Sequence, residues 1–98
     1  MVDHVVAYRL RAGVSGADTV PVARAIEDLR HAIPGVVSVR TGVNCGPEAY
    51  RGGYDWGFVM TFQSRRDLIG YFEHAAHLAV IPMVETITED LVVFDLEY

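Results

Sequence analysis

VDHVVAYRL, at residues 2–10, decides how this chain folds. Successive side chains of a β-strand point to opposite faces, so every second residue shares a face with Val2: His4, Val6, Tyr8 and Leu10. The opposite face is apolar too, because it carries Val5 and Ala7. A strand that is apolar on both faces is typical of a sheet that is covered on both sides.

Working outward from this strand, the first helix follows a short connector. We expect the helix to begin near Asp18 or Thr19, either of which can cap it, with Pro21 in the first turn, where proline is tolerated. Its apolar residues recur at helical spacing: Val22, Ile26, Leu29 and Ile33. Pro34 and Gly35 should end it.

The rest of the chain continues with the same two periodicities. Alternation predicts strands at residues 36–42, 54–62 and 91–96, with a loop at 44–53. Ser64 and Asp67 resemble a capping box at the start of a second helix. That helix should bend near residues 73–77 and continue to about Thr88, with Pro82 as a break or a restart.

The resulting order, βαββαβ, predicts an α+β ferredoxin-like fold in one domain covering residues 1–98. Both helices would cover one face of a four-stranded antiparallel sheet. The other face would carry apolar side chains: Val5, Ala7, Val92, Phe94 and Leu96. We therefore expect a homodimer in which two sheets pack face to face.

Composition excludes several classes of protein. The chain has 98 residues, of which 51% are hydrophobic, so it is not disordered. Its formal net charge is −5 and its eight basic residues are scattered arginines, so we expect neither nucleic acid nor a membrane surface as a partner. No apolar run is long enough to span a bilayer, and the start, MVDHVV, is unlike a signal peptide, which predicts a cytoplasmic protein.

Three side chains could carry chemistry: His4 on the first strand, and Tyr71 and His77 around the bend in the second helix. A phenol and an imidazole that face one apolar cavity could polarise a carbonyl group and move a proton beside it. Each residue also has a structural interpretation. His4 could be a satisfied core histidine, Tyr71 could belong to the apolar stripe of its helix, and His77 could bond to backbone at the bend.

Other motifs point away from further chemistry. His74 and His77 lie three residues apart but lack a carboxylate in helical register, so we expect no metal site. His74 alone could cap the helix or face solvent. Cys45 is the single cysteine and reads as an inert loop thiol. The glycine-rich loop fits neither phosphate-binding fingerprint, and no nucleophile elbow is present.

These segments together resemble the stress-responsive dimeric α/β-barrel (Dabb) family. The resemblance covers essentially the whole chain, and its carriers are short segments in a fixed order: His4-Val5-Val6, residues 11–15, Ile33-Pro34-Gly35-Val36, Gly42-x-Asn44, Gly53-Tyr54-Asp55, Met60-Thr61-Phe62-x-Ser64, Tyr71-x-x-His74-x-x-His77 and residues 91–95. The resemblance implies a ferredoxin-like protomer that forms a homodimeric α+β barrel.

The same family includes a polyketide cyclase branch, which closes a linear poly-β-ketone by an intramolecular aldol condensation. Its Tyr and His acid–base pair falls on Tyr71 and His77, and its pocket histidine falls on His4. This chain has aliphatic residues in the first helix, where the cyclase pocket is aromatic. It also has Ala75 where the family often has proline. The resemblance therefore implies a pocket of different shape.

Two functions follow as expectations. The first is a cofactor-independent enzyme for a small, apolar, carbonyl-containing ligand, with His77 as general base, Tyr71 as hydrogen-bond donor and His4 orienting the substrate. Apolar side chains would line the pocket: Val6, Tyr8, Ile26, Phe58, Val80, Leu91 and Val93. The second is a non-catalytic, stress-responsive dimer that binds an apolar ligand or a protein. A cofactor-free oxygenase or haem-binding relative is a third alternative, from fold analogy alone.

Overall fold

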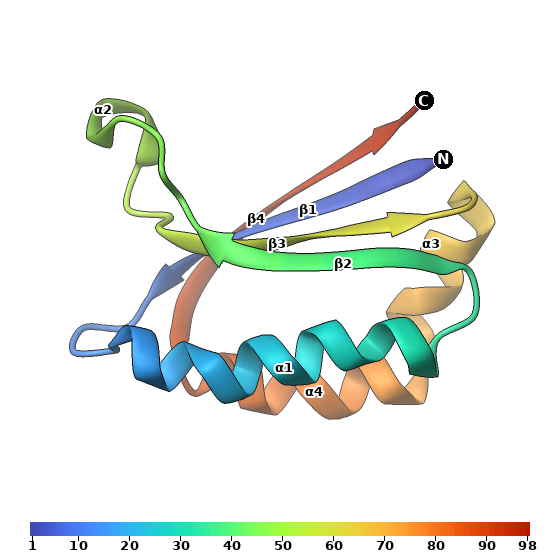
Figure 1. Ribbon diagram of the computed structural model, residues 1–98, viewed down its shortest axis with the longest axis horizontal. Helices are drawn as coiled ribbons and strands as arrows, with labels where there is room; N and C mark the ends of the chain where they lie inside the picture. The colour runs from blue at the N-terminus through green and yellow to red at the C-terminus, as the bar shows by residue number, and fades with distance from the viewer.

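The computed structural model describes residues 1–98 and contains four strands and four helices (Figure 1). In chain order they are β1 Val2–Leu10, α1 Gly16–Ala32, β2 Val36–Val43, α2 Glu48–Arg51, β3 Trp56–Phe62, α3 Arg65–Glu73, α4 Ala75–Glu85 and β4 Thr88–Glu97. The strands form one antiparallel sheet in the order β2-β3-β1-β4. This confirms the ferredoxin-like α+β prediction.

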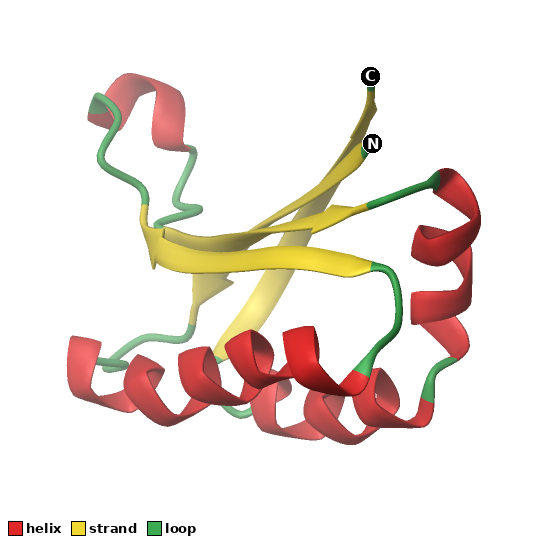
Figure 2. Cartoon of the chain, turned by 45° about the vertical axis from the view of Figure 1, so that its right-hand side comes forward, coloured by secondary structure: helices red, strands yellow, loops and turns green.

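The core lies between the sheet and the helices α1, α3 and α4, which lie on one side of it (Figure 2). Met60 and Phe62 on β3 are fully buried, and the predicted stripe of α1 packs against them with Val22, Ile26 and Leu29 buried. Removing each such side chain from water contributes about 1.5–3 kcal/mol, so this layer fixes the position of everything on the inner face of the sheet.

The start of α1 differs from the prediction. The helix begins at Gly16, and Ser15 is its N-cap, with the carboxylate of Asp18 accepting hydrogen bonds from the Ser15 N–H and hydroxyl at 2.8 and 3.1 Å. The predicted caps Asp18 and Thr19 were therefore wrong. Pro21 consequently lies in the second turn, where its missing N–H costs the helix one backbone hydrogen bond.

Other boundaries were also placed imprecisely. β3 begins at Trp56, so Tyr54 precedes the strand, and β4 begins at Thr88 rather than at residue 91. The predicted loop contains the short helix α2. The predicted Ser64 cap is confirmed, since its hydroxyl accepts the Asp67 N–H at 3.2 Å, but Pro82 lies inside α4 without breaking it.

The outer face of the sheet is apolar and uncovered in one copy of the chain. On β4, Val92, Phe94 and Leu96 are 50%, 63% and 48% exposed, while Val5 and Ala7 on β1 are half-buried. The helices cover only the other face (Figures 1 and 2). No helix has the length and apolar character needed to cross a membrane.

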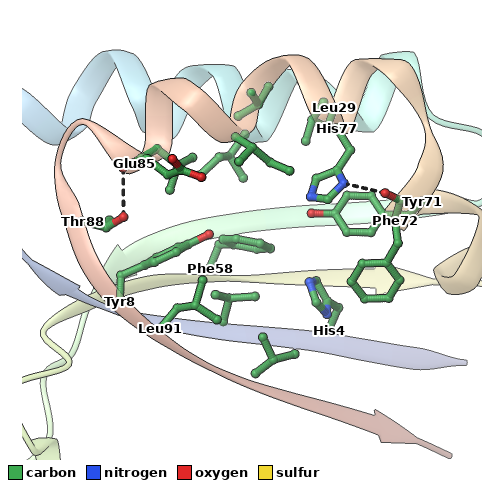
Figure 3. A pocket seen from close by; sticks show the side chains of 16 residues that line it. His4, Tyr8, Leu29, Phe58, Tyr71, Phe72, His77, Glu85, Thr88 and Leu91 are labelled. Carbon is green, nitrogen blue, oxygen red and sulfur yellow. Dashed lines mark hydrogen bonds between the residues drawn. The ribbon is translucent and has the colours of Figure 1, made fainter.

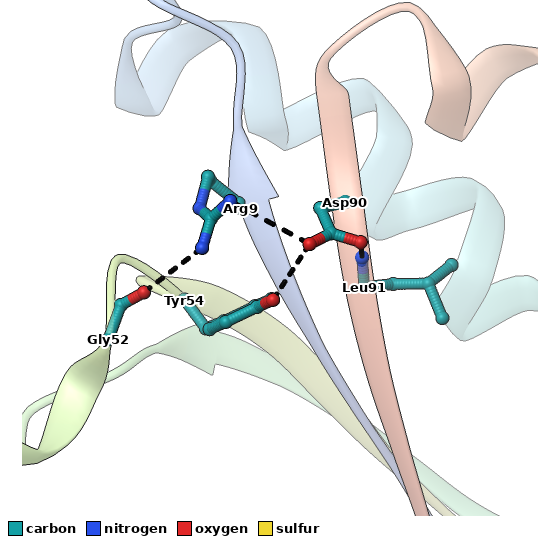
Figure 4. Close-up of polar contacts among 5 residues, drawn as sticks. All are labelled: Arg9, Gly52, Tyr54, Asp90 and Leu91. Atoms are coloured by element: carbon teal, nitrogen blue, oxygen red, sulfur yellow. Dashed lines mark hydrogen bonds and ion pairs between the residues drawn. The ribbon is translucent and has the colours of Figure 1, made fainter.

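The connection between β2 and β3 projects beyond the sheet and is tied back to it by a polar cluster (Figure 4). The Tyr54 hydroxyl donates to Asp90 at 2.8 Å, and the Arg9 guanidinium lies over the Tyr54 ring and donates to the Gly52 carbonyl at 3.3 Å. Arg9 also pairs with Asp90 at 3.7 Å. The cluster joins this connection to β1 and β4 immediately beside Leu91.

Candidate active site

A cavity of about 280 Å³ lies between the inner face of the sheet and the helices. All ten residues that the sequence analysis placed in the site line it: His4, Val6, Tyr8, Ile26, Phe58, Tyr71, His77, Val80, Leu91 and Val93. Six further residues line it that were not predicted: Leu29, Phe72, Ile81, Val84, Glu85 and Thr88. The apolar stripes of α1 and α4 face the same layer, so these stripes could have indicated several of the six residues.

Tyr71 and His77 meet because the second helical region is divided at His74. His74 donates its backbone N–H to the Tyr71 carbonyl, ending α3, and its Nδ1 accepts the Ala76 N–H at 3.0 Å, starting α4. The capping interpretation of His74 is thereby confirmed. The resulting bend places the His77 ring against the Tyr71 ring, with their centroids 4.0 Å apart (Figure 3).

The surroundings keep these side chains in defined protonation states. Burial lowers the pKa of His77, which favours the neutral imidazole. Burial raises the pKa of Tyr71 well above its usual range and raises the pKa of Tyr8 to about 12, so both phenols stay protonated. The cavity therefore combines a neutral base with two neutral hydrogen-bond donors.

His77 has a defined orientation as well. Its Nδ1 lies 3.4 Å from the carbonyl oxygen of Phe72. With the proton on Nδ1 directed at that carbonyl, Nε2 carries the free lone pair and can accept a proton.

The hydroxyl groups of Tyr8 and Tyr71 point into the cavity (Figure 3). Both residues are buried, at 7% and 2% exposure, yet neither hydroxyl makes a hydrogen bond within the chain. The one fully buried side-chain polar atom without a partner is Nε of Arg51, so these two hydroxyl oxygens keep some contact with the open space of the cavity. These two donors are therefore available to a ligand.

His4 forms a close pair with Asp95, a residue that the sequence analysis did not place in the site. The antiparallel register of β1 and β4 sets the two residues opposite each other, and His4 Nδ1 lies 2.5 Å from Asp95 Oδ1. His4 is 2% exposed, whereas the Asp95 side chain is 32% exposed. The available signal was alternation, because Asp95 shares its strand face with Leu91 and Val93.

Aromatic rings hold His4 at the end of the cavity. Its ring centroid lies 5.4–6.4 Å from those of four residues: Phe58, Phe62, Tyr71 and Phe72. The site thus links a carboxylate, an imidazole, a phenol and a second imidazole in one apolar frame, an arrangement suited to acid–base chemistry. Nowhere in the chain do three metal-ligating side chains gather into a possible metal site.

Comparison with known proteins supports this architecture. The model of the stress responsive A/B barrel domain family matches residues 2–98. Among solved structures, the Arabidopsis thaliana protein At3g17210 superposes with a TM-score of 0.92 at 22% identity, covering 100% of this chain and 95% of the other. No match is found among curated proteins.

Two further structures share the fold. A dimeric ferredoxin-like protein of unknown function from Jannaschia sp. CCS1 has a TM-score of 0.84 at 23% identity, covering 99% of this chain and 98% of its own. The hydroxynitrile lyase of Passiflora edulis has a TM-score of 0.83 at 21% identity, covering 97% and 90%. At these identities the likeness concerns the fold.

Proposed function

This chain belongs to the stress responsive A/B barrel domain family. We propose that it is a small enzyme acting on an apolar, carbonyl-bearing substrate without a cofactor. The observation that carries the proposal is the Tyr71–His77 pair, which shares one wall of an apolar cavity at a ring separation of 4.0 Å. Aldol-type cyclisation, as in polyketide cyclases, is the reaction that this pair suits best.

The proposed steps follow from the protonation states of the pair. Neutral His77 removes a proton from the carbon beside a carbonyl, while the Tyr71 hydroxyl donates a hydrogen bond to the oxygen on which negative charge develops. The enolate carbon then attacks a second carbonyl carbon of the same molecule. The alkoxide so formed takes the proton back from the His77 imidazolium, and His77 is neutral again.

The other polar groups would position the substrate. Tyr8 offers a second unpaired hydroxyl on the same cavity, and Asp95 holds the His4 ring in one orientation through Nδ1. Holding both carbonyl groups in place contributes to the rate because it removes the entropic cost of bringing them together.

Cleavage of a carbon–carbon bond in a small substrate is a second candidate reaction, and the size of the cavity favours it. At about 280 Å³ it lies at the lower end of ligand pockets, and a long poly-β-ketone would have to fold tightly to enter it. A cyanohydrin is smaller and needs the same base and the same hydrogen-bond donor. A hydroxynitrile lyase is among the proteins that share this fold.

Turnover of two probes separates these candidates: a linear triketide thioester for cyclisation and mandelonitrile for cleavage. Loss of the acid or base should lower the rate by about 10²–10⁴-fold in His77→Gln and Tyr71→Phe. His31→Gln on α1 and Tyr50→Phe on α2 are matched controls, since both residues are exposed and neither lines the cavity. Equal rates in all four variants would contradict the assignment.

Absence of turnover with both probes would favour the non-catalytic alternative, a dimer that binds an apolar ligand. Native mass spectrometry of protein purified under mild conditions tests it directly. A retained small molecule, lost in a variant that fills the cavity such as Val80→Trp, is the expected result for a binding protein.

We further propose that two copies pair through the outer sheet face. Three neighbouring side chains of β4 on that face are about half exposed or more, which is unusual for a chain that remains a monomer. In sedimentation analysis, the wild type should behave as a dimer and Phe94→Asp as a monomer. Ile69→Asp on the exposed side of α3 is the control. A monomeric wild type would refute the pairing.

A further inference from the structure

We propose that the cavity selects neutral carbonyl compounds and excludes carboxylates and other anions. The inference takes the carbonyl class of the ligand from the proposed function. The exclusion of anions is inferred from the charge of the cavity lining. No arginine is among the residues that line the cavity, and the chain contains no lysine. Any anion that entered would therefore meet no permanent positive charge.

The ionisable groups of the lining are neutral or negative. Glu85 is the one carboxylate among them, and His4 is paired with the carboxylate of Asp95 at 2.5 Å. Burial favours the neutral form of His77, as described above. The guanidinium of Arg11 donates to the backbone carbonyl of the lining residue Glu85 at 3.1 Å, but Arg11 does not line the cavity.

A neutral carbonyl oxygen suits this lining. The unpaired hydroxyls of Tyr8 and Tyr71 can each donate one hydrogen bond to it, and the apolar walls cover the rest of the molecule. A carboxylate would leave water, where its charge is well solvated, for a space with no cation to pair with it. We expect discrimination of at least about 100-fold in Kd between a neutral ligand and its anionic counterpart.

Glu85 extends this selection to the rim of the cavity. It is exposed at the end of α4, and Figure 3 shows it beside Thr88 at the end opposite His4 and Phe72. A negative charge in that position repels anions before they reach the phenols. Reversing the charge should therefore relax the selection without changing the walls that bind a neutral molecule.

The test uses methyl benzoate and benzoate, which share a skeleton and differ in charge. Each is titrated into ¹⁵N-labelled protein at neutral pH while the amide signals of the cavity residues are followed. Methyl benzoate should give saturable shifts, and benzoate should bind at least about 100-fold more weakly. In Glu85→Arg, the ratio of the benzoate Kd to the methyl benzoate Kd should fall about tenfold or more; Glu89→Arg, exposed on β4 outside the lining, is the control.

Equal affinity for the two ligands, or no binding of methyl benzoate, would overturn the inference. If Glu89→Arg raised the affinity for benzoate as much as Glu85→Arg, net charge and not the cavity rim would govern binding. That result would also overturn the inference. Selective binding of methyl benzoate without turnover of any carbonyl probe would leave this inference intact and refute the proposed function instead.

Discussion

Replacing Asp95 with alanine should destabilise the fold measurably, because it removes the partner of a buried imidazole. His4 is 2% exposed and lies among four aromatic rings, so its ring has little access to water except on the side of Asp95, whose side chain is 32% exposed. Leaving a buried donor unsatisfied costs about 1–3 kcal/mol, and the 2.5 Å contact to a carboxylate places this pair near the middle of that range or above.

A loss of about 2 kcal/mol lowers the Tm of a domain of this length by about 8–16 °C. Asp95→Asn keeps an acceptor oxygen for Nδ1 but loses the charge, so we expect it to lose about half as much. Asp55→Ala is the control: the Asp55 side chain is exposed, its one side-chain partner is Arg51 at 3.7 Å, and surface ion pairs contribute little.

Thermal and urea unfolding at one fixed protein concentration measure these differences, since the Tm of a protein that associates depends on concentration. The decisive comparison is between Asp95→Ala and Asp55→Ala. If both lower the free energy of unfolding by the same few tenths of a kcal/mol, aromatic packing alone holds His4, and a stabilising role for the His4–Asp95 pair is refuted.

Three other results should follow. Gly57→Ala should unfold the protein or lower its stability by several kcal/mol, because an added Cβ would lie 2.1 Å from the Val6 carbonyl oxygen. Gly42→Ala is the control and should have a mild effect on stability, because no atom lies within 4 Å of the added Cβ. Circular dichroism distinguishes the two variants. Because burial lowers the pKa of His77 below 6.5, the unfolded chain binds that proton more readily. Stability should therefore decline as the pH falls below about 6.5 in urea titrations, and less steeply in His77→Gln. Ser64→Ala should cost about 1 kcal/mol in the same titrations by removing the cap of α3; no change would refute the cap.

The strands and helices that show a regular spacing of apolar residues were predicted well. The alternation in β1 and β3 and the stripe of α1 are local patterns, and the residues they place inside are buried, apart from the half-buried Leu10 and Tyr54. The start of α1 was missed although Ser15-x-x-Asp18 repeats the spacing of Ser64-x-x-Asp67, which was recognised. Pro21 caused the error, since confining it to the first turn moved the expected start toward Asp18.

The site was predicted only as far as local sequence allows. Tyr71 and His77 could be paired because a bend was expected between them, and the cap formed by His74 supplies that bend. Asp95 could not be paired with His4, because that contact depends on the register between strands at opposite ends of the chain. Alternation predicts on which face of its strand a residue lies, but it does not predict which residue of the neighbouring strand lies opposite it.

The position of β1 in the sheet has a consequence for how the chain folds. β1 lies between β3 and β4, and the amino group of Met1 donates to the Tyr98 carbonyl at 3.0 Å. β1 is synthesised before β4, so one edge of β1 stays unpaired until the ten-residue β4 has been made. Until then, the unpaired backbone groups of this apolar strand can pair with a strand of another chain, which promotes aggregation. The pair between His4 and Asp95 forms only after β4 has paired with β1, so the candidate site is assembled only at that stage.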